Sequence, residues 1–349
     1  MIRPLHRGVT TVAVTAVLGT LVGCAAEPPP DSWVLTPISY DNRMDGDSGP
    51  PDVIDAAYPM TLTGDTAGGF WGASAGSFLH VDAEGDAVRR FNLDPGAPSG
   101  AIAAVSPTVL VMSTGEPTPT YPGSVMLFDT AAMTWTDVHR DERALGDIAT
   151  HGGDVYVVAY AFGEPAFTIE KLTLDTRADP VPVGPVFAGH GQVAIDVDSA
   201  GTLFVATDSE RFTLAADGTV QQQEPVGSAS PVVSVNERGD VAWSGLAPAS
   251  AALPSFVVGG SVEARDIIDA HVRCDPESPE LSLHGVDYLT LATRQDSLTL
   301  PFLCAPRSIT WINDHELVVS IGTEGGAPLV RLTPPSDAPR AGPYEAVRR

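Results

Sequence analysis

Cysteine, lysine and long uninterrupted hydrophobic segments are all scarce in this chain. Its 349 residues include 3 cysteines, with no CxxC pair and no Cys/His cluster, so the sequence gives no support for a structural zinc site. Lys171 is the only lysine, and 44 acidic residues against 19 basic ones give a net charge of −25. A surface this acidic is a poor partner for nucleic acid or anionic lipid headgroups.

Motifs that would mark an active site are also missing or incomplete. No phosphate-binding loop or dinucleotide fingerprint is present, and the histidines are scattered singly without metal-binding spacing. Residues 72–76 match the G-x-S-x-G pattern of serine hydrolases, but Phe78-Leu79-His80-Val81 follows them and predicts a strand. Because the nucleophile elbow requires a helix at that place, we interpret the match as coincidental. We assign no catalytic residue and no metal ligand.

Two segments space carboxylates two residues apart near glycine, as calcium loops do. They are Asp45-Gly46-Asp47-Ser48-Gly49 and Asp196-Val197-Asp198-Ser199-Ala200-Gly201. Neither contains the full ligand series with a terminal bidentate glutamate, and a polar turn explains the second. No cofactor is therefore predicted, and Ca²⁺ is kept only as an alternative.

The amino terminus has the order of an export signal. Arg3 and Arg7 precede an uncharged stretch over residues 8–23, which is too short and too rich in threonine to span a membrane as a helix. It ends in Leu21-Val22-Gly23-Cys24, which closely resembles the bacterial lipobox. The alternative is an ordinary signal peptide with an incidental cysteine.

The lipobox resemblance implies a lipoprotein with a signal peptide at residues 1–23 and a lipid-bearing Cys24. Residues 24–31 are rich in proline and would tether a domain to the cell membrane, outside the cytoplasm. In that compartment Cys274 and Cys304 are candidates for one disulfide, with two free buried thiols as the alternative. The tail at residues 336–349 is expected to be disordered.

The remaining residues, 32–335, show strand patterns and no helical periodicity. Short valine-rich runs recur about every 40 residues, which is the period of four-stranded propeller blades. This predicts an all-β chain. The clearest runs are residues 77–81, 109–112, 155–158, 203–206, 241–243, 288–291 and 317–320.

Finer repeats strengthen this expectation. Residues 193–205 form a strand, a glycine-containing polar turn and a second strand, and residues 233–243 repeat the pattern. Here the chain resembles the β-propeller superfamily: Val193 to Val220 is similar to an NHL or SMP-30-type repeat, and Val125 to Val138 to the end of a kelch blade. The seven runs predict seven blades, with six or eight as alternatives.

A closed ring needs its two ends joined. Residues 32–36 could supply the outer strand of the last blade, beside residues 329–332, which would remove an exposed sheet edge. The alternative is that Trp33 only packs under the domain.

Function is expected at one mouth of the ring. If the runs are second strands, the irregular segments that follow them gather there, carrying exposed aromatics such as Tyr121 and Phe162. With little charge in these segments, a protein or saccharide ligand is favoured over a phosphate or metal. We therefore expect a non-enzymatic binding or scaffold module. The alternatives are a metal-dependent hydrolase or lactonase of the SMP-30-like type and a structural subunit of an envelope assembly.

Overall fold

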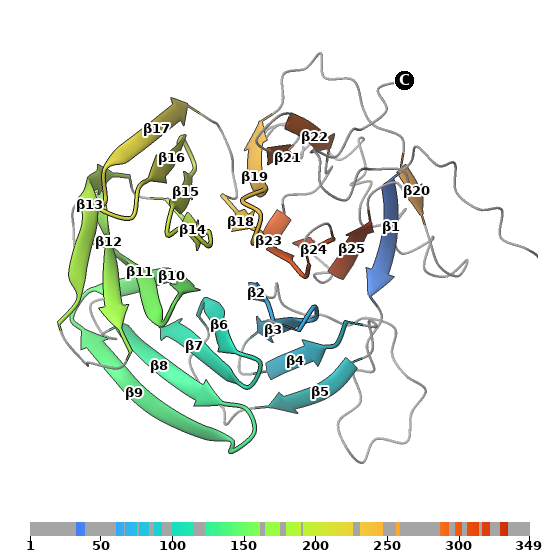
Figure 1. Ribbon diagram of the computed structural model, residues 1–349, viewed down its shortest axis with the longest axis horizontal. Helices are drawn as coiled ribbons and strands as arrows, with labels where there is room; N and C mark the ends of the chain where they lie inside the picture. Colours follow the sequence, from blue (N-terminus) through green and yellow to red (C-terminus); the bar gives the residue numbers. More distant parts are fainter. Residues whose placement is uncertain are drawn as a thin grey trace, which may run out of the picture.

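The computed structural model of this chain is built from β-strands throughout its described part. That part comprises residues 33–38, 61–65, 67–74, 77–83, 87–92, 100–114, 123–160, 165–174, 179–189, 191–225, 231–246, 256–258, 287–292, 297–301, 306–313, 316–321 and 329–333. The strands form five four-stranded sheets and one five-stranded sheet. Figure 1 shows these sheets radiating around a common centre.

Each of the first three sheets is an antiparallel meander of four consecutive strands. The first contains β2 (Thr61–Gly64), β3 (Phe70–Ser74), β4 (Ser77–Val81) and β5 (Ala87–Asn92). The second contains β6 (Ile102–Ser106), β7 (Val109–Thr114), β8 (Gly123–Asp129) and β9 (Thr134–Asp141). The third contains β10 (Ala144–His151), β11 (Asp154–Tyr160), β12 (Ala166–Thr173) and β13 (Val181–Ala188).

The other three sheets use the rest of the described residues, including both ends of the described part. The fourth contains β14 (Val193–Val197), β15 (Leu203–Thr207), β16 (Glu210–Leu214) and β17 (Val220–Pro225). The fifth contains β18 (Val233–Val235), β19 (Val241–Leu246), β21 (Asp287–Ala292) and β22 (Ser297–Pro301). The last contains β23 (Pro306–Trp311), β24 (Leu317–Ile321), β25 (Leu329–Thr333), β1 (Trp33–Ile38) and β20 (Phe256–Val258).

The sheets close into one ring. The first strand of each sheet contacts the first strand of the next, in the order β2, β6, β10, β14, β18, β23 and back to β2. These six innermost strands surround the centre seen in Figure 1. The described sheets are therefore the blades of a β-propeller.

The ring is closed by the amino-terminal strand, as the sequence predicts. β1 pairs antiparallel with β25, placing Leu35 opposite Leu332. Ile38 is buried in one cluster with Leu62 of β2 and Leu329 of β25. The outer strand of the last blade thus comes from the other end of the described chain, and β20 pairs parallel to it.

The expected count of seven blades is wrong, because the described strands make six sheets. The runs at residues 241–243 and 288–291 lie in β19 and β21, which pair with each other as the second and third strands of one sheet. The long chain segment between these strands made one blade resemble two. A second error is that residues 77–81 form β4, the third strand of its blade and not the second.

Tight polar turns join the first and second strands of several blades. In the turn after β14, Asp198 Oδ1 accepts hydrogen bonds from the backbone N–H groups of Ala200 and Thr202. Asn236 repeats this after β18. Gly201 and Gly239 each have φ near +80°, a conformation that side chains disfavour. The predicted strand–turn–strand repeat is confirmed at both places.

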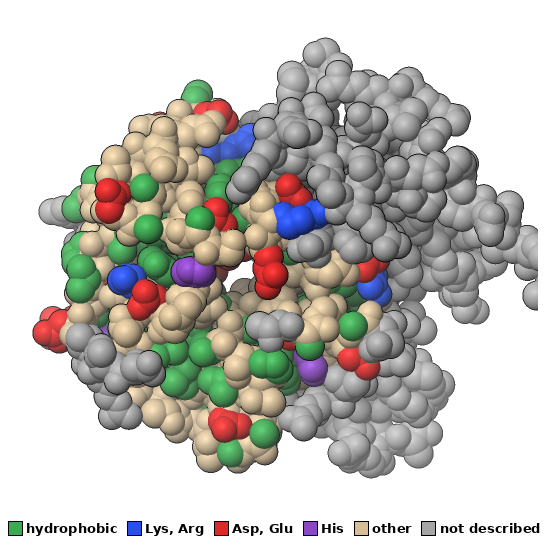
Figure 2. Space-filling model, in the orientation of Figure 1, with side chains coloured by type: hydrophobic (Ala, Val, Ile, Leu, Met, Phe, Trp, Pro, Cys, Tyr) green, Lys and Arg blue, Asp and Glu red, His purple; other side chains and the backbone are tan. Residues whose placement is uncertain are grey.

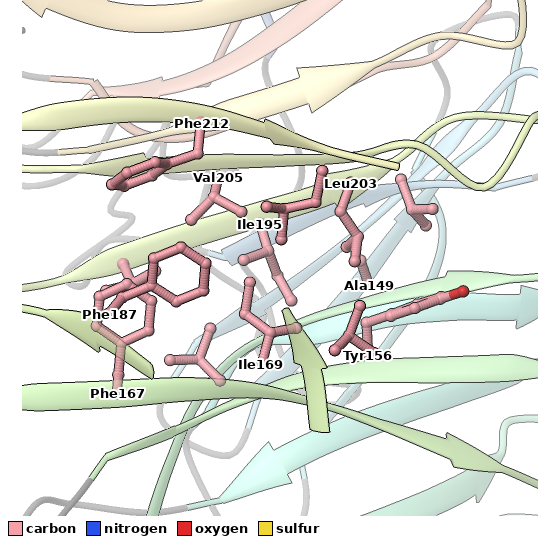
Figure 3. Packing of buried hydrophobic residues seen from close by; sticks show 14 residues of the cluster. Ala149, Tyr156, Phe167, Ile169, Phe187, Ile195, Leu203, Val205 and Phe212 are labelled. Atoms are coloured by element: carbon pink, nitrogen blue, oxygen red, sulfur yellow. The ribbon is translucent and has the colours of Figure 1, made fainter. Parts of the chain in front are cut away.

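The hydrophobic core lies between neighbouring blades. Figure 3 shows the packing between the third and fourth blades, where rings from β12, β13 and β16 meet. Phe187 lies 5.1 Å, centre to centre, from both Phe167 and Phe212. Similar buried clusters join the first blade to the second, the second to the third, the fourth to the fifth and the last to the first. This packing holds the innermost strands in place around the axis.

Candidate functional site

A cavity of about 1210 Å³ occupies the centre of the ring. Residues of all six innermost strands line it, so it follows the length of the propeller axis. The hollow is visible in Figure 2, with acidic side chains beside it. Its volume slightly exceeds the range typical of small-molecule sites, roughly 300–1,000 Å³. This channel is the candidate functional site.

Side chains on the channel wall connect adjacent blades. An innermost strand has one unpaired edge, and its N–H groups there need acceptors. At five of the six junctions, a side chain on one innermost strand accepts a hydrogen bond from a backbone N–H of the next. The pairs are Thr63 with Ala104 (3.2 Å), Asp147 with Ile195 (2.8 Å), Asp196 with Val235 (2.7 Å), Ser234 with Trp311 (3.3 Å) and Ser308 with Leu62 (2.9 Å).

The junction between the second and third blades uses side-chain donors instead. Thr150 Oγ1 donates to the carbonyl oxygen of Ala104 at 2.7 Å, and Ser113 Oγ donates to the carbonyl of Gly146. Each junction thus has at least one polar contact across it. The polar side chains of the channel wall therefore help to hold adjacent blades together and so stabilise the ring.

Asp147 and Asp196 are the two carboxyl groups of this set. Each is deep within the protein yet keeps part of its surface exposed to the channel that it lines. Burial raises the pKa of Asp147 to about 7, the nearby Asp196 raises it further, and the N–H groups of Ile195 and Ile148 oppose the shift. Burial likewise raises the pKa of Asp196 to about 6, opposed chiefly by the N–H of Val235.

Tyr160, at the end of β11, completes this part of the wall. Its hydroxyl oxygen accepts a hydrogen bond from the N–H of Val193 at 3.2 Å. Burial raises the pKa of Tyr160 to about 12, and the negative charge of Asp147 contributes to the rise. The ring packs against Gly146, where an added Cβ would come within 2.6 Å of it. The third and fourth blades thus bring a phenol and two carboxyl groups to one side of the channel.

The site residues predicted from sequence are elsewhere. Cys24, Cys274, Cys304, Tyr121 and Phe162 all lie outside the described residues, and so does the first calcium-loop candidate at 45–49. The strand order does confirm that three of the expected loops join second to third strands, after β7, β11 and β24.

The two remaining motifs lie at the ends of strands. Ser74 ends β3 and pairs with Ser77 at the start of the antiparallel strand β4, so no helix follows the G-x-S-x-G match. The Asp198 carboxylate caps the turn after β14, whereas Asp196 extends into the channel. The two carboxylates of the second calcium-loop candidate therefore have different roles: Asp198 caps a turn, and Asp196 lines the channel.

Asp147 is the channel residue that sequence inspection missed. A single charged residue in the strand Ala144-Leu145-Gly146-Asp147-Ile148-Ala149 is unusual, because aspartate is depleted in strands. The aspartate within a strand is the only feature of the sequence that could have pointed to this residue. Within the described residues, no group of three or more His, Cys, Asp and Glu side chains could hold a metal ion. No helix in the same part of the chain is long and apolar enough to cross a membrane.

Comparison with known proteins gives the fold and no family. No protein-family model matches this sequence. No curated protein matches it either. Among solved structures, a protein of unknown function from Bacteroides thetaiotaomicron is similar, with a TM-score of 0.52, 11% identity and coverage of 86% of this chain and 76% of that one. A luciferin-regenerating enzyme is similar with a TM-score of 0.50, 11% identity and coverage of 86% and 95%. With the closed ring of blades, these likenesses show that the chain is an all-β protein of the β-propeller fold.

Proposed function

We propose that this protein is a lipid-anchored, extracytoplasmic β-propeller that binds a polar ligand in its central channel. The single observation that carries the binding role is the cavity of about 1210 Å³ lined by every innermost strand. Hydroxyl, amide and carboxyl side chains line it together with apolar ones, which suits a saccharide or a peptide segment better than an apolar molecule.

The lipid anchor is supported by the sequence of residues 21–24 and by the position of β1. Only eight residues separate Cys24 from Trp33, the first residue of that strand. A chain spans at most roughly 3.3–3.6 Å per residue, so this tether would keep the propeller close to the membrane. A Cys24→Ser variant should lose fatty-acid labelling and move from the membrane fraction to the soluble one. Membrane retention without labelling would contradict the anchor.

The binding role is tested by filling the channel. Gln192 is exposed and lines the channel just before β14, so Gln192→Trp should narrow it without disturbing the core. Gln222→Trp on the exposed strand β17 is the matched control. A ligand found by glycan-array or peptide-array screening of the detergent-solubilised protein should bind the control and fail to bind Gln192→Trp. Equal binding to both variants would place the ligand site elsewhere.

A metal-dependent hydrolase or lactonase is the second candidate. It is favoured by the two channel aspartates, by the resemblance of residues 193–220 to SMP-30-type repeats, and by the likeness in fold to a luciferin-regenerating enzyme. Against it, the aspartates already accept hydrogen bonds from backbone N–H groups. Hydrolysis of simple lactones that depends on added Ca²⁺ or Mn²⁺ and is lost in Asp196→Asn would establish it; no turnover would leave the binding role.

A further inference from the structure

The wall of the channel between the third and fourth blades carries negative charge without a cation to balance it. Asp147 and Asp196 accept hydrogen bonds from neutral backbone amides, and within the described residues neither forms an ion pair with lysine, arginine or histidine. The other charged residues that line the channel are Asp65, Glu237 and Arg307. Of these, Asp65 is already hydrogen-bonded to His80 Nε2 at 2.7 Å, which leaves three acids and one base on the wall.

Such carboxyl groups are costly to keep charged. Removing an ion from water costs several kcal/mol unless an opposite charge or further hydrogen bonds compensate it. Here the backbone N–H groups offset part of the cost of burying the charge. The pKa values of Asp147 and Asp196 remain raised, at about 7 and 6, because the rest of that cost is not offset. A cation entering the channel would supply the missing compensation and would hold both groups ionised.

The wall suits an organic cation better than a metal ion. Asp147 Oδ2 accepts a hydrogen bond from the N–H of Ile195, and both oxygens of Asp196 accept one, from the N–H groups of Val197 and Val235. Each oxygen keeps a second lone pair for a further donor, but no third metal ligand joins the pair within the described part of the chain. An ammonium group needs acceptors without a fixed coordination geometry, and the aromatic ring of Tyr160 beside the carboxyls adds a surface that cations favour. The cavity is also large enough for the rest of an organic molecule.

We propose that the central channel binds ligands bearing a primary ammonium group, which sits against Asp147, Asp196 and Tyr160 on the wall formed by β10, β11 and β14. This inference rests on the proposed function of the channel as a ligand site, and it names the class of ligand. An amino sugar and a lysine side chain both present this group.

Calorimetric titration of the full-length, detergent-solubilised protein with putrescine tests the proposal, with 1,4-butanediol as the uncharged counterpart. Putrescine should bind at pH 8, butanediol should not, and binding should weaken at pH 5 because both carboxyls become protonated. Asp147→Asn and Asp196→Asn should each weaken putrescine binding by about tenfold or more, the usual loss for a charge-assisted hydrogen bond. Asp217→Asn, in the exposed turn before β17, removes the same charge away from the channel and should have no effect.

Two outcomes would overturn the proposal: equal binding of putrescine and butanediol, or putrescine binding unchanged in both channel variants with their folds intact by circular dichroism. If a neutral saccharide binds wild type and fails with Gln192→Trp while putrescine does not bind, the channel function stands and the ammonium inference is wrong. If putrescine does bind as expected, comparing glucosamine with N-acetylglucosamine and a lysine peptide with its acetylated form separates the two sources of the ammonium group.

Discussion

Replacing Asp147 by asparagine should make the protein more stable at pH 8. The pKa of Asp147 is raised from 3.8 to about 7, chiefly by burial. A raised carboxyl pKa contributes stability that is fully present below the unfolded value and is lost as pH rises through the folded one. The wild type should therefore lose stability between about pH 4 and pH 8, and asparagine, which cannot ionise, should not. Its side-chain oxygen can still accept from the N–H of Ile195.

The magnitude follows from the shift. A rise of roughly 3 pKa units corresponds to about 4 kcal/mol at 1.36 kcal/mol per unit, which is an upper limit. Because Asp147 keeps contact with channel water, we expect a gain of about 1–3 kcal/mol in the free energy of unfolding at pH 8. Urea denaturation of wild type and Asp147→Asn at pH 5 and pH 8 measures it.

The Asp217→Asn variant controls for the change in net charge, since Asp217 lies in an exposed turn. The argument is refuted if Asp147→Asn is no more stable than wild type at pH 8, or if the stability difference between the two proteins is the same at pH 5 and pH 8. Either result would mean that ionisation of Asp147 does not cost the folded protein stability.

Three further predictions concern the ring. Phe212→Ala opens a void between the third and fourth blades and should cost about 3–5 kcal/mol by urea denaturation, whereas Val186→Ala, at a side chain 68% exposed, should change stability little. Deleting residues 33–38 removes β1 and exposes the edge of β25, so the melting temperature should fall and light scattering should show aggregation. Arg143→Ala leaves the buried Glu170 without its cation and should destabilise the protein by about 1–3 kcal/mol, with Arg140→Ala, on an exposed pair, as the control.

The fold was largely predictable from sequence because a blade has a strong local pattern. Strands of three to eight residues, polar turns such as the one at Asp198 and a period near 40 residues are all visible without coordinates. The closing strand β1 could be foreseen because an open ring would expose an edge. The blade count could not, since the sequence does not show that β19 and β21 pair with each other across a long intervening segment.

The candidate site was much harder to predict. Its wall consists of short segments from six distant parts of the chain, most of them alanine, valine, glycine, serine or threonine, and their orientation toward a common axis is fixed only when the ring closes. Asp196 was noticed in the sequence for its spacing from Asp198, but the two side chains have separate roles. Asp147 belongs to no sequence motif, so its place on the channel wall could not be predicted.

The pairing of β1 with β25 also sets the order in which the molecule can be completed. These strands lie at opposite ends of the described chain, so the last blade cannot assemble until almost all of the polypeptide is available. Contacts that join distant residues form slowly, because the intervening chain must first be ordered. Until residues 329–333 are available, β1 lacks its antiparallel partner and β24 has one unpaired edge, which could recruit another strand. A nascent or truncated chain that ends before residue 329 would therefore be an incomplete ring prone to self-association.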